Sequence, residues 1–106
     1  GETYEGEWKN DQAHGFGKYT ISIGVYYEGN WKNDIPHGSG KEIWSNGSTY
    51  EGDYINGEKG IRGKLTFTDG SIYEGEFNEN NIDGYGLFEW RSGKKYQGQW
   101  KNNKMH

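Results

Sequence analysis

The chain has 106 residues, of which hydrophobic residues make up 29% and Phe, Trp and Tyr alone 17%. Aliphatic side chains are therefore too few for a conventional two-layer core, and the aromatic content argues against disorder. The net charge of -4 gives no support to nucleic-acid binding, and the absence of Cys excludes disulfides and fits a reducing, intracellular compartment. No apolar run approaches the ~20 residues of a membrane span.

A Tyr-Glu-Gly tripeptide returns every 23 residues from Tyr4 onward and ends as Tyr96-Gln97-Gly98. A fixed period of this length is typical of a repeat array, in which each unit buries apolar surface by stacking on its neighbours. We therefore expect one array over residues 1–106. Its units are 4–26, 27–49, 50–72 and 73–95, with a partial unit at 96–106. The chain opens and closes partway through a unit, which predicts a fragment of a longer array.

Each unit begins with a segment in which aromatic residues and Gly alternate with polar residues, as in Tyr27-Glu28-Gly29-Asn30-Trp31. This period of two predicts a strand with its aromatic side chains on one face. Turn formers follow at Asn33-Asp34-Ile35-Pro36, and the return strand covers residues 38–44. Loops such as Ser45-Asn46-Gly47 then predict a type I turn closed by a left-handed Gly. The predicted fold is all-β, a single-layer antiparallel β-sheet solenoid of consecutive 23-residue hairpin repeats without a substantial helix.

In the register that follows, aromatic positions of successive strands form one continuous row. The expected row is Tyr4, Tyr19, Tyr27, Glu42, Tyr50, Leu65, Tyr73, Phe88 and Tyr96. Beside it we expect Trp8 and Trp31 to face Gly15 and Gly38, because a Gly-x-Gly segment leaves space for a ring on the backbone. On the opposite face, glutamates and lysines should pair across strands. These pairs are Glu5 with Lys18, Glu28 with Lys41, and Glu51 with Lys64.

The pattern Tyr-Glu-Gly-x-Trp, a turn, His-Gly-x-Gly and then Asn/Asp-Gly resembles the MORN (membrane occupation and recognition nexus) repeat. Residues 4–17 and 27–40 match it closely, and the likeness covers essentially the whole chain. The resemblance implies an often curved, single-layer antiparallel sheet. It also implies a scaffold in cytoskeletal, ciliary and membrane-junction proteins, or an appendage to enzymes such as phosphoinositide kinases and SET-domain methyltransferases.

The third unit departs from this pattern. It has Gly60-Ile61-Arg62-Gly63 in place of His-Gly-x-Gly, and Tyr54 in place of Trp. We interpret the smaller ring and the larger Ile as a volume exchange within a tolerated variant of the repeat. The fourth unit has Asp83 in place of His and Phe77 in place of Trp.

Metal binding and catalysis are not expected. His14, His37 and His106 occupy equivalent places, but equivalent residues of successive hairpins lie about 9.5 Å apart, too far to share a zinc ion. A His that closes its hairpin turn by hydrogen bonds is the simpler interpretation. Glu5 and Glu7 have the separation of a glycosidase acid pair, but a solvated surface with Lys nearby does not provide the desolvated pocket that a catalytic acid needs. We therefore predict a non-enzymatic module with no metal and no cofactor.

A single-layer sheet cannot cover both of its faces, so its aromatic face would leave a stripe of Tyr and Trp in water, which predicts a binding surface. We expect this aromatic groove to bind a peptide segment or helix of a protein partner, with a second copy of the chain as an alternative occupant. The predicted contact residues are Tyr4, Trp8, Tyr27, Trp31, Trp44, Tyr50, Tyr54, Tyr73, Phe77, Trp90 and Tyr96.

Three other functions stay open. An anionic-phospholipid module at a membrane surface would need basic clusters, whereas Lys9, Lys32 and Lys101 alternate with acids. Carbohydrate or choline binding would share the stacking Trp but not the Tyr-Glu-Gly spacing. The third alternative is a regulatory repeat domain of a larger enzyme. The resemblance places such arrays at the cytoskeleton or at membranes.

Overall fold

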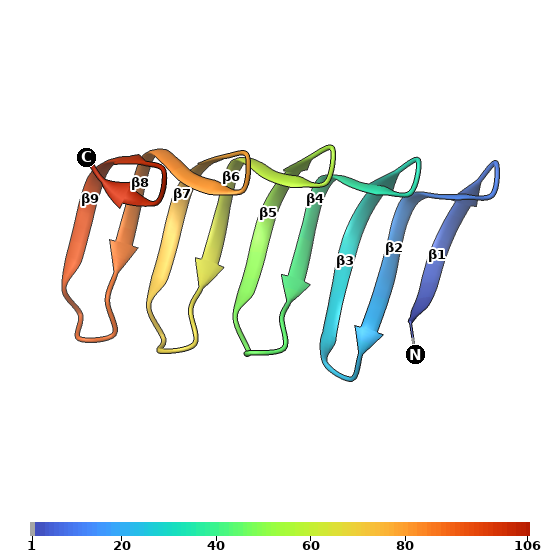
Figure 1. Ribbon diagram of the computed structural model, residues 1–106, viewed down its shortest axis with the longest axis horizontal. Helices are drawn as coiled ribbons and strands as arrows, with labels where there is room; N and C mark the ends of the chain where they lie inside the picture. The colour runs from blue at the N-terminus through green and yellow to red at the C-terminus, as the bar shows by residue number, and fades with distance from the viewer. Residues whose placement is uncertain (1) are drawn as a thin grey trace.

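The computed structural model describes residues 2–106, and this part of the chain contains strands and turns but no helix. Its strands pair in chain order as one open, 10-stranded antiparallel sheet (Figure 1). The strands are β1 (Thr3–Lys9), β2 (Gln12–Ser22), β3 (Val25–Lys32), β4 (Ile35–Ile43), β5 (Thr49–Ile55), β6 (Glu58–Thr66), β7 (Ile72–Asn78), β8 (Asn81–Glu89), β9 (Lys95–Lys101) and β10 (Lys104–Met105). The predicted fold class is confirmed.

Two kinds of turn connect the strands. The turn inside each unit places two residues in the left-handed region, for example Asn33 at φ 50° and Asp34 at φ 70°, as type I′ hairpins require. Between units, the predicted three-residue loop is confirmed at 45–47, where the Gly47 N–H donates to the Trp44 carbonyl at 2.9 Å. The first such loop differs, because Ser22 pairs with Val25 across a shorter turn.

The predicted aromatic row is confirmed pair by pair from Tyr4 opposite Tyr19 to Phe88 opposite Tyr96. The glutamate–lysine register on the other face is also confirmed. The row beside it, in which we expected Trp8 and Trp31 to face Gly15 and Gly38, is different from the prediction. Trp31 pairs with Pro36 in its own hairpin and with Gly15 of the preceding unit, and Trp8 pairs with Ala13. The reason is a bulge that shifts the register inside each hairpin.

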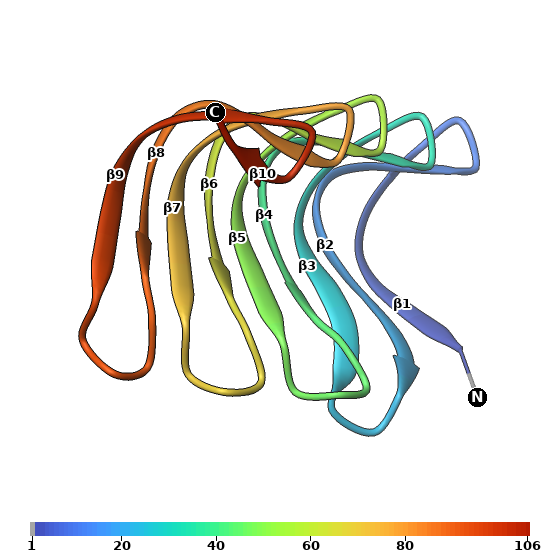
Figure 2. The ribbon, with the colours of Figure 1, turned by 60° about the vertical axis from the view of Figure 1, so that its left-hand side comes forward.

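The bulge bends every hairpin at the same level. In the first unit Gly6 pairs with Gly17 and Trp8 with Ala13, so one residue on β1 lies opposite three residues on β2. Such an insertion makes a strand bend. The same shift recurs in the second, third and fourth units. Figure 2 shows the result, a sheet whose strands turn sharply near one end and give it an angled cross-section.

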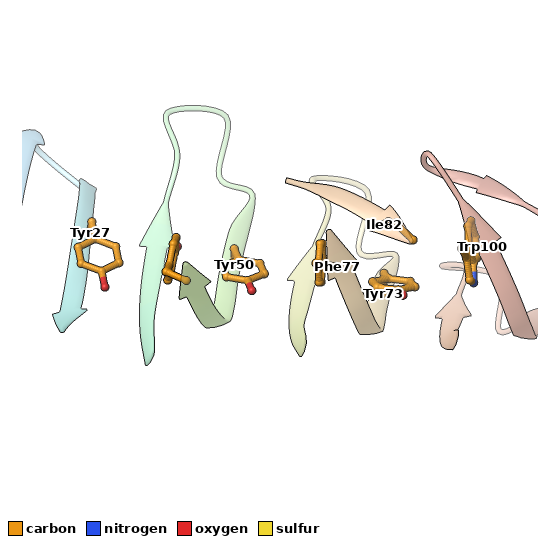
Figure 3. Close-up of a cluster of buried hydrophobic side chains, with 7 residues drawn as sticks. Tyr27, Tyr50, Tyr73, Phe77, Ile82 and Trp100 are labelled. Atoms are coloured by element: carbon orange, nitrogen blue, oxygen red, sulfur yellow. The ribbon is translucent and has the colours of Figure 1, made fainter. Parts of the chain in front are cut away.

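The aromatic row lies on the inner side of this bend. Trp44 and Lys59 lie about six residues apart along the strands, a separation of roughly 20 Å in a flat sheet. The Lys59 ammonium nevertheless lies 4.8 Å from the centre of the Trp44 ring. We call this side the inner face and the glutamate–lysine side the outer face. Figure 3 shows rings of successive units following one another along the inner face.

Three hairpin turns are each clamped to the preceding unit by two hydrogen bonds. At the first interface the Asp34 N–H donates to the Ala13 carbonyl at 2.9 Å, and the Asp34 side chain accepts the Ala13 N–H at 2.7 Å. Asn80 clamps Lys59 in the same way, and so does Asn103 with Ile82. The side chain at the second turn position therefore adds a hydrogen bond between successive repeats.

The second interface lacks half of this clamp. Gly57 donates its N–H to the Pro36 carbonyl at 2.8 Å, but Gly57 has no side-chain acceptor and Pro36 has no N–H. The missing acceptor at Gly57 lies opposite the missing N–H at Pro36, so this interface leaves no unpaired donor or acceptor at the clamp. The turn clamp between the second and third units consequently has one hydrogen bond fewer than the clamps at the other three interfaces.

The paired substitution Pro36→Ala with Gly57→Asn should restore the missing bond. We expect the double variant to be more stable than the sum of the single variants by about 1 kcal/mol, the net worth of one hydrogen bond. Asn tolerates the positive φ of this turn position, as Asn80 does at φ 70°. A urea-unfolding double-mutant cycle measures this coupling. Strictly additive effects would show that the bond does not form.

Ile61 is a strained position in the third unit. Its φ is 63°, whereas the equivalent Gly15, Gly38 and Gly84 have φ 90°, 99° and 100°. Ile61 pairs with Phe77 of the next unit and is 58% exposed, while Tyr54 lies opposite Lys59 and is buried. The predicted volume exchange between Tyr54 and Ile61 is therefore wrong. Ile61 occupies a backbone site that suits Gly, with its side chain largely in water.

Ile61→Gly should stabilise the protein. A left-handed conformation costs roughly 1–2 kcal/mol for a residue with a Cβ, and the exposed side chain contributes little burial. We expect a gain of about 1 kcal/mol in the free energy of unfolding, measured as a higher urea midpoint at unchanged slope. The reverse change, Gly38→Ile, is the matched control and should destabilise. A lower midpoint for Ile61→Gly would contradict the strain.

Candidate interaction surface

The repeating Tyr side chains lie flat over the glycine row. Gly6, Gly17 and Gly29 pair in sequence, and the row continues along the sheet to Gly98. A Cβ on Gly63 would lie 2.6 Å from Cζ of Tyr50, so the ring occupies the space that a side chain would need. The second Gly of each Gly-x-Gly segment is thus the socket for the Tyr of its own hairpin.

A hydrogen bond from the hydroxyl and edge-on contacts with neighbouring rings hold each Tyr ring in its socket. The Tyr50 hydroxyl donates to the Asp53 carbonyl at 2.9 Å, and Tyr27 and Tyr73 make the equivalent bond three residues along their strands. Tyr50 also packs edge-on against Tyr54 at 5.3 Å and Phe77 at 5.2 Å between ring centroids. Such T-shaped pairs add to the stabilisation from burial. Burial also raises the pKa of the Tyr73 hydroxyl to about 12.

The bend changes which predicted contact residues a partner could reach. Tyr50 and Tyr73 are 0% exposed, and Tyr27, Tyr54 and Phe77 are also buried. Our premise that a single-layer sheet leaves this whole row in water is wrong, because the two arms of the bend cover its centre. The remaining predicted residues retain accessible surface. They are Tyr4, Trp8, Trp31, Trp44, Trp90 and Tyr96.

Accessible rings gather on the arm next to the three-residue loops. Trp44, Phe67, Phe88 and Trp90 are all half-buried, and we call them the aromatic strip. The ring centroids of Phe67 and Phe88 lie 5.6 Å apart, and those of Phe88 and Trp90 lie 4.7 Å apart. Sequence reasoning omitted Phe67 and Phe88 from the candidate site, although Phe67 occupies the repeat position of Trp44 and Trp90.

Polar groups interrupt the inner face in the middle of the array. Glu42 replaces an apolar residue in the aromatic row, and its two oxygens accept hydrogen bonds from the Tyr54 hydroxyl and the Trp44 Nε1, both at 2.5 Å. Burial, followed by the bond to Glu42, raises the pKa of the Tyr54 hydroxyl well above its usual range. Lys59 lies beside this pair, over the rings of Trp44 and Tyr50.

The expectation that the His residues close their own hairpin turns by hydrogen bonds is wrong. Nδ1 of His37 accepts the Asn56 N–H at 3.2 Å, so the imidazole supports the turn of the following unit. Asp83 takes the same role toward Asn102 at 3.4 Å, whereas Nδ1 of His14 is buried without a hydrogen-bond partner. Within residues 2–106, no cluster of His, Asp and Glu has the arrangement of a metal site.

In the same described range, no helix has the length and apolarity to cross a membrane. A comparison with curated proteins finds no match to the chain. A family model, described as the MORN repeat, matches residues 4–26, 27–49, 50–72, 73–95 and 96–106. Together with the repeated hairpins and their Tyr–Gly sockets, this match over nearly the whole sequence shows that the chain belongs to the MORN repeat family, whose members are generally non-enzymatic protein- and membrane-interaction modules.

Proposed function

We propose that this array is a non-enzymatic module that binds a segment of a protein partner on its inner face, along the aromatic strip. The observation that carries the proposal is the difference in burial among the aromatic rings of the inner face. Tyr50 and Tyr73 are fully buried by the chain itself, while Trp44, Phe67, Phe88 and Trp90 keep part of their surface in water. Contiguous, half-exposed aromatic rings are typical anchors of protein interfaces.

The separation between buried structural rings and half-exposed rings supports this assignment. The buried Tyr residues hold the sheet in its bent shape, and this rigid frame presents the strip without further ordering. A preformed surface loses less entropy on binding than a flexible one, which favours affinity. A peptide strand or a helix could lie across several units, because the strip runs along successive hairpins on one arm of the sheet.

Affinity capture with matched surface variants tests the proposal. Phe67→Ala and Trp90→Ala remove rings from the strip, whereas Phe16→Ala and Tyr85→Ala remove rings that are 54% and 47% exposed on the outer face. We expect the strip variants to weaken partner binding by about thirtyfold or more, as loss of a hot-spot anchor does, and the outer-face variants to bind as the parent does. Circular dichroism confirms that each variant is folded before its binding is compared.

Two further measurements separate the alternative functions. Light scattering measures the molecular mass of the isolated chain. If a second copy occupies the strip, the parent has the mass of a dimer and the strip variants have that of a monomer. Flotation with anionic liposomes reports membrane binding. Loss of partner binding in the outer-face variants alone would assign the interaction to the other side of the sheet and overturn the proposal.

A further inference from the structure

The inner face carries a different balance of charge from the rest of the chain. The whole sequence has 16 acidic and 12 basic side chains. On the inner face the carboxylates are Glu2 and Glu42, and both are engaged by tyrosine hydroxyls, Glu2 by Tyr19 and Glu42 by Tyr54. A carboxylate that already accepts such bonds offers less to an incoming cation.

The cations of this face are Lys59 and Lys94, and each lies over a Trp of the aromatic strip. The Lys59 ammonium is 4.8 Å from the Trp44 ring centroid, and the Lys94 ammonium is 5.6 Å from that of Trp90. Neither lysine has a carboxylate opposite it in the sheet, since Lys59 pairs with Tyr54 and Lys94 bonds to Trp90 through its backbone. A ring attracts a cation to its face without neutralising the charge as a carboxylate would.

Outer-face lysines have the opposite arrangement. Lys41 lies between Glu28 and Glu51 in the register, and Lys64 lies between Glu51 and Glu74. Their charge is balanced by carboxylates in adjacent strands. The aromatic strip therefore has a lysine at each of its two Trp residues, and the carboxylate beside it, Glu42, is hydrogen-bonded to Tyr54 and Trp44.

We infer that the segment bound by the inner face is acidic as well as apolar, with carboxylates that pair with Lys59 and Lys94 while its apolar side chains contact Phe67 and Phe88. This inference rests on the proposed function and adds the chemistry of the partner. Ion pairs formed beside rings, where water is partly excluded, are stronger than pairs in open solvent. A basic segment would meet two like charges, and the carboxylate beside the strip, Glu42, already has both oxygens hydrogen-bonded.

An acidic peptide fits these charges better than an anionic membrane does. Surface attraction contributes only about 1 kcal/mol per basic residue, and useful membrane binding needs larger basic clusters than two lysines. The strip also lies on one arm of a bent sheet, and a narrow chain segment can follow such a curved surface more readily than the plane of a bilayer can.

Selection from a displayed library of random dodecapeptides tests the inference with no assumption about a natural partner. The bait is the full chain, compared with Lys59→Gln and Lys94→Gln and with the matched outer-face controls Lys41→Gln and Lys64→Gln. All four changes remove one charge, and Lys59→Gln retains the backbone groups that Asn80 clamps. Synthetic versions of the enriched peptides are then measured by fluorescence titration.

We expect the parent to enrich peptides in which Asp or Glu alternates with Leu, Phe or other apolar residues. Each inner-face variant should bind these peptides about tenfold more weakly and lose the acidic preference, while the outer-face variants bind as the parent does. Higher salt should reduce the affinity of the parent more than that of Lys59→Gln.

The possible failures are distinguishable. Enrichment of apolar peptides without acidic residues would overturn the inference and leave the proposed function in place. Equal weakening by all four variants would show general attraction to acidic peptides and also overturn it. If the parent enriches no peptide, both proposals fail. Phosphatidylserine vesicles that bind the parent but not Lys59→Gln, in the absence of enriched peptides, would assign the two lysines to a lipid surface.

Discussion

Tyr50→Ala is expected to lower the free energy of unfolding by about 3–5 kcal/mol, the usual cost of removing a large aromatic side chain from a core. Tyr50 is fully buried, and its hydroxyl satisfies the Asp53 carbonyl. Its ring also packs against Tyr54 within its own unit and Phe77 of the next. Loss of this ring therefore weakens both its own hairpin and an inter-repeat contact. Urea unfolding followed by tryptophan fluorescence measures the change.

Two controls accompany this variant. Tyr85→Ala removes the same side chain from the outer face, where it is 47% exposed, and should cost less than about 1 kcal/mol. Tyr50→Phe keeps the ring and removes only the hydroxyl, so its cost isolates the bond to Asp53. Equal destabilisation by Tyr50→Ala and Tyr85→Ala would contradict the assignment of the inner face as the core.

Gly63→Ala is expected to destabilise the protein by about 3 kcal/mol, at the upper end of the cost of overpacking. The added methyl group would lie 2.6 Å from Cζ of Tyr50, closer than unbonded carbons can approach. The ring has little freedom to retreat, because Tyr54 and Phe77 hold its other edges. Backbone strain is not the cause, since Gly63 is absent from the positions with positive φ in the described residues.

Because the Tyr50 ring lies in the Gly63 socket, we expect the effects of Tyr50→Ala and Gly63→Ala on stability to be coupled. In the Tyr50→Ala background the space over Gly63 is empty, so Gly63→Ala should cost little or even recover part of the lost burial. The double variant should then be more stable than the sum of the single variants by about 1–3 kcal/mol. Thermal or urea unfolding of all four proteins closes the cycle. Additive losses would show that the methyl group disturbs something other than the ring.

Much of the fold could be predicted because the same spacing, alternation and turn residues recur in successive units. The period of 23 residues sets the hairpin length, and the alternation around Tyr27 and Trp31 sets the faces. The Gly at 47 sets an odd loop, which keeps the same face inward in the next strand. Local constraints of this kind act within one or two strands, so the sequence is sufficient to specify them.

The candidate site was less predictable, because accessibility depends on the bend. From the alternation alone, Tyr50 and Trp44 lie on one face and look equivalent. The bulge that follows Gly6, Gly29, Gly52 and Gly75 then folds the sheet around the Tyr row and leaves the aromatic strip at its margin. A bulge depends on hydrogen bonds between strands, including that from the Phe16 N–H to Glu7 at 2.9 Å.

By itself, the sequence determined the repeat boundaries, the hairpins, the order of the strands and the identity of the two faces. These follow from short-range periodicity and turn chemistry, which every unit repeats. Only the tertiary structure decided which rings are core and which are accessible, how turns are clamped to preceding units, and that Lys59 reaches Trp44. Those features arise where residues distant along the strands approach one another across the bend, and no local pattern encodes that distance.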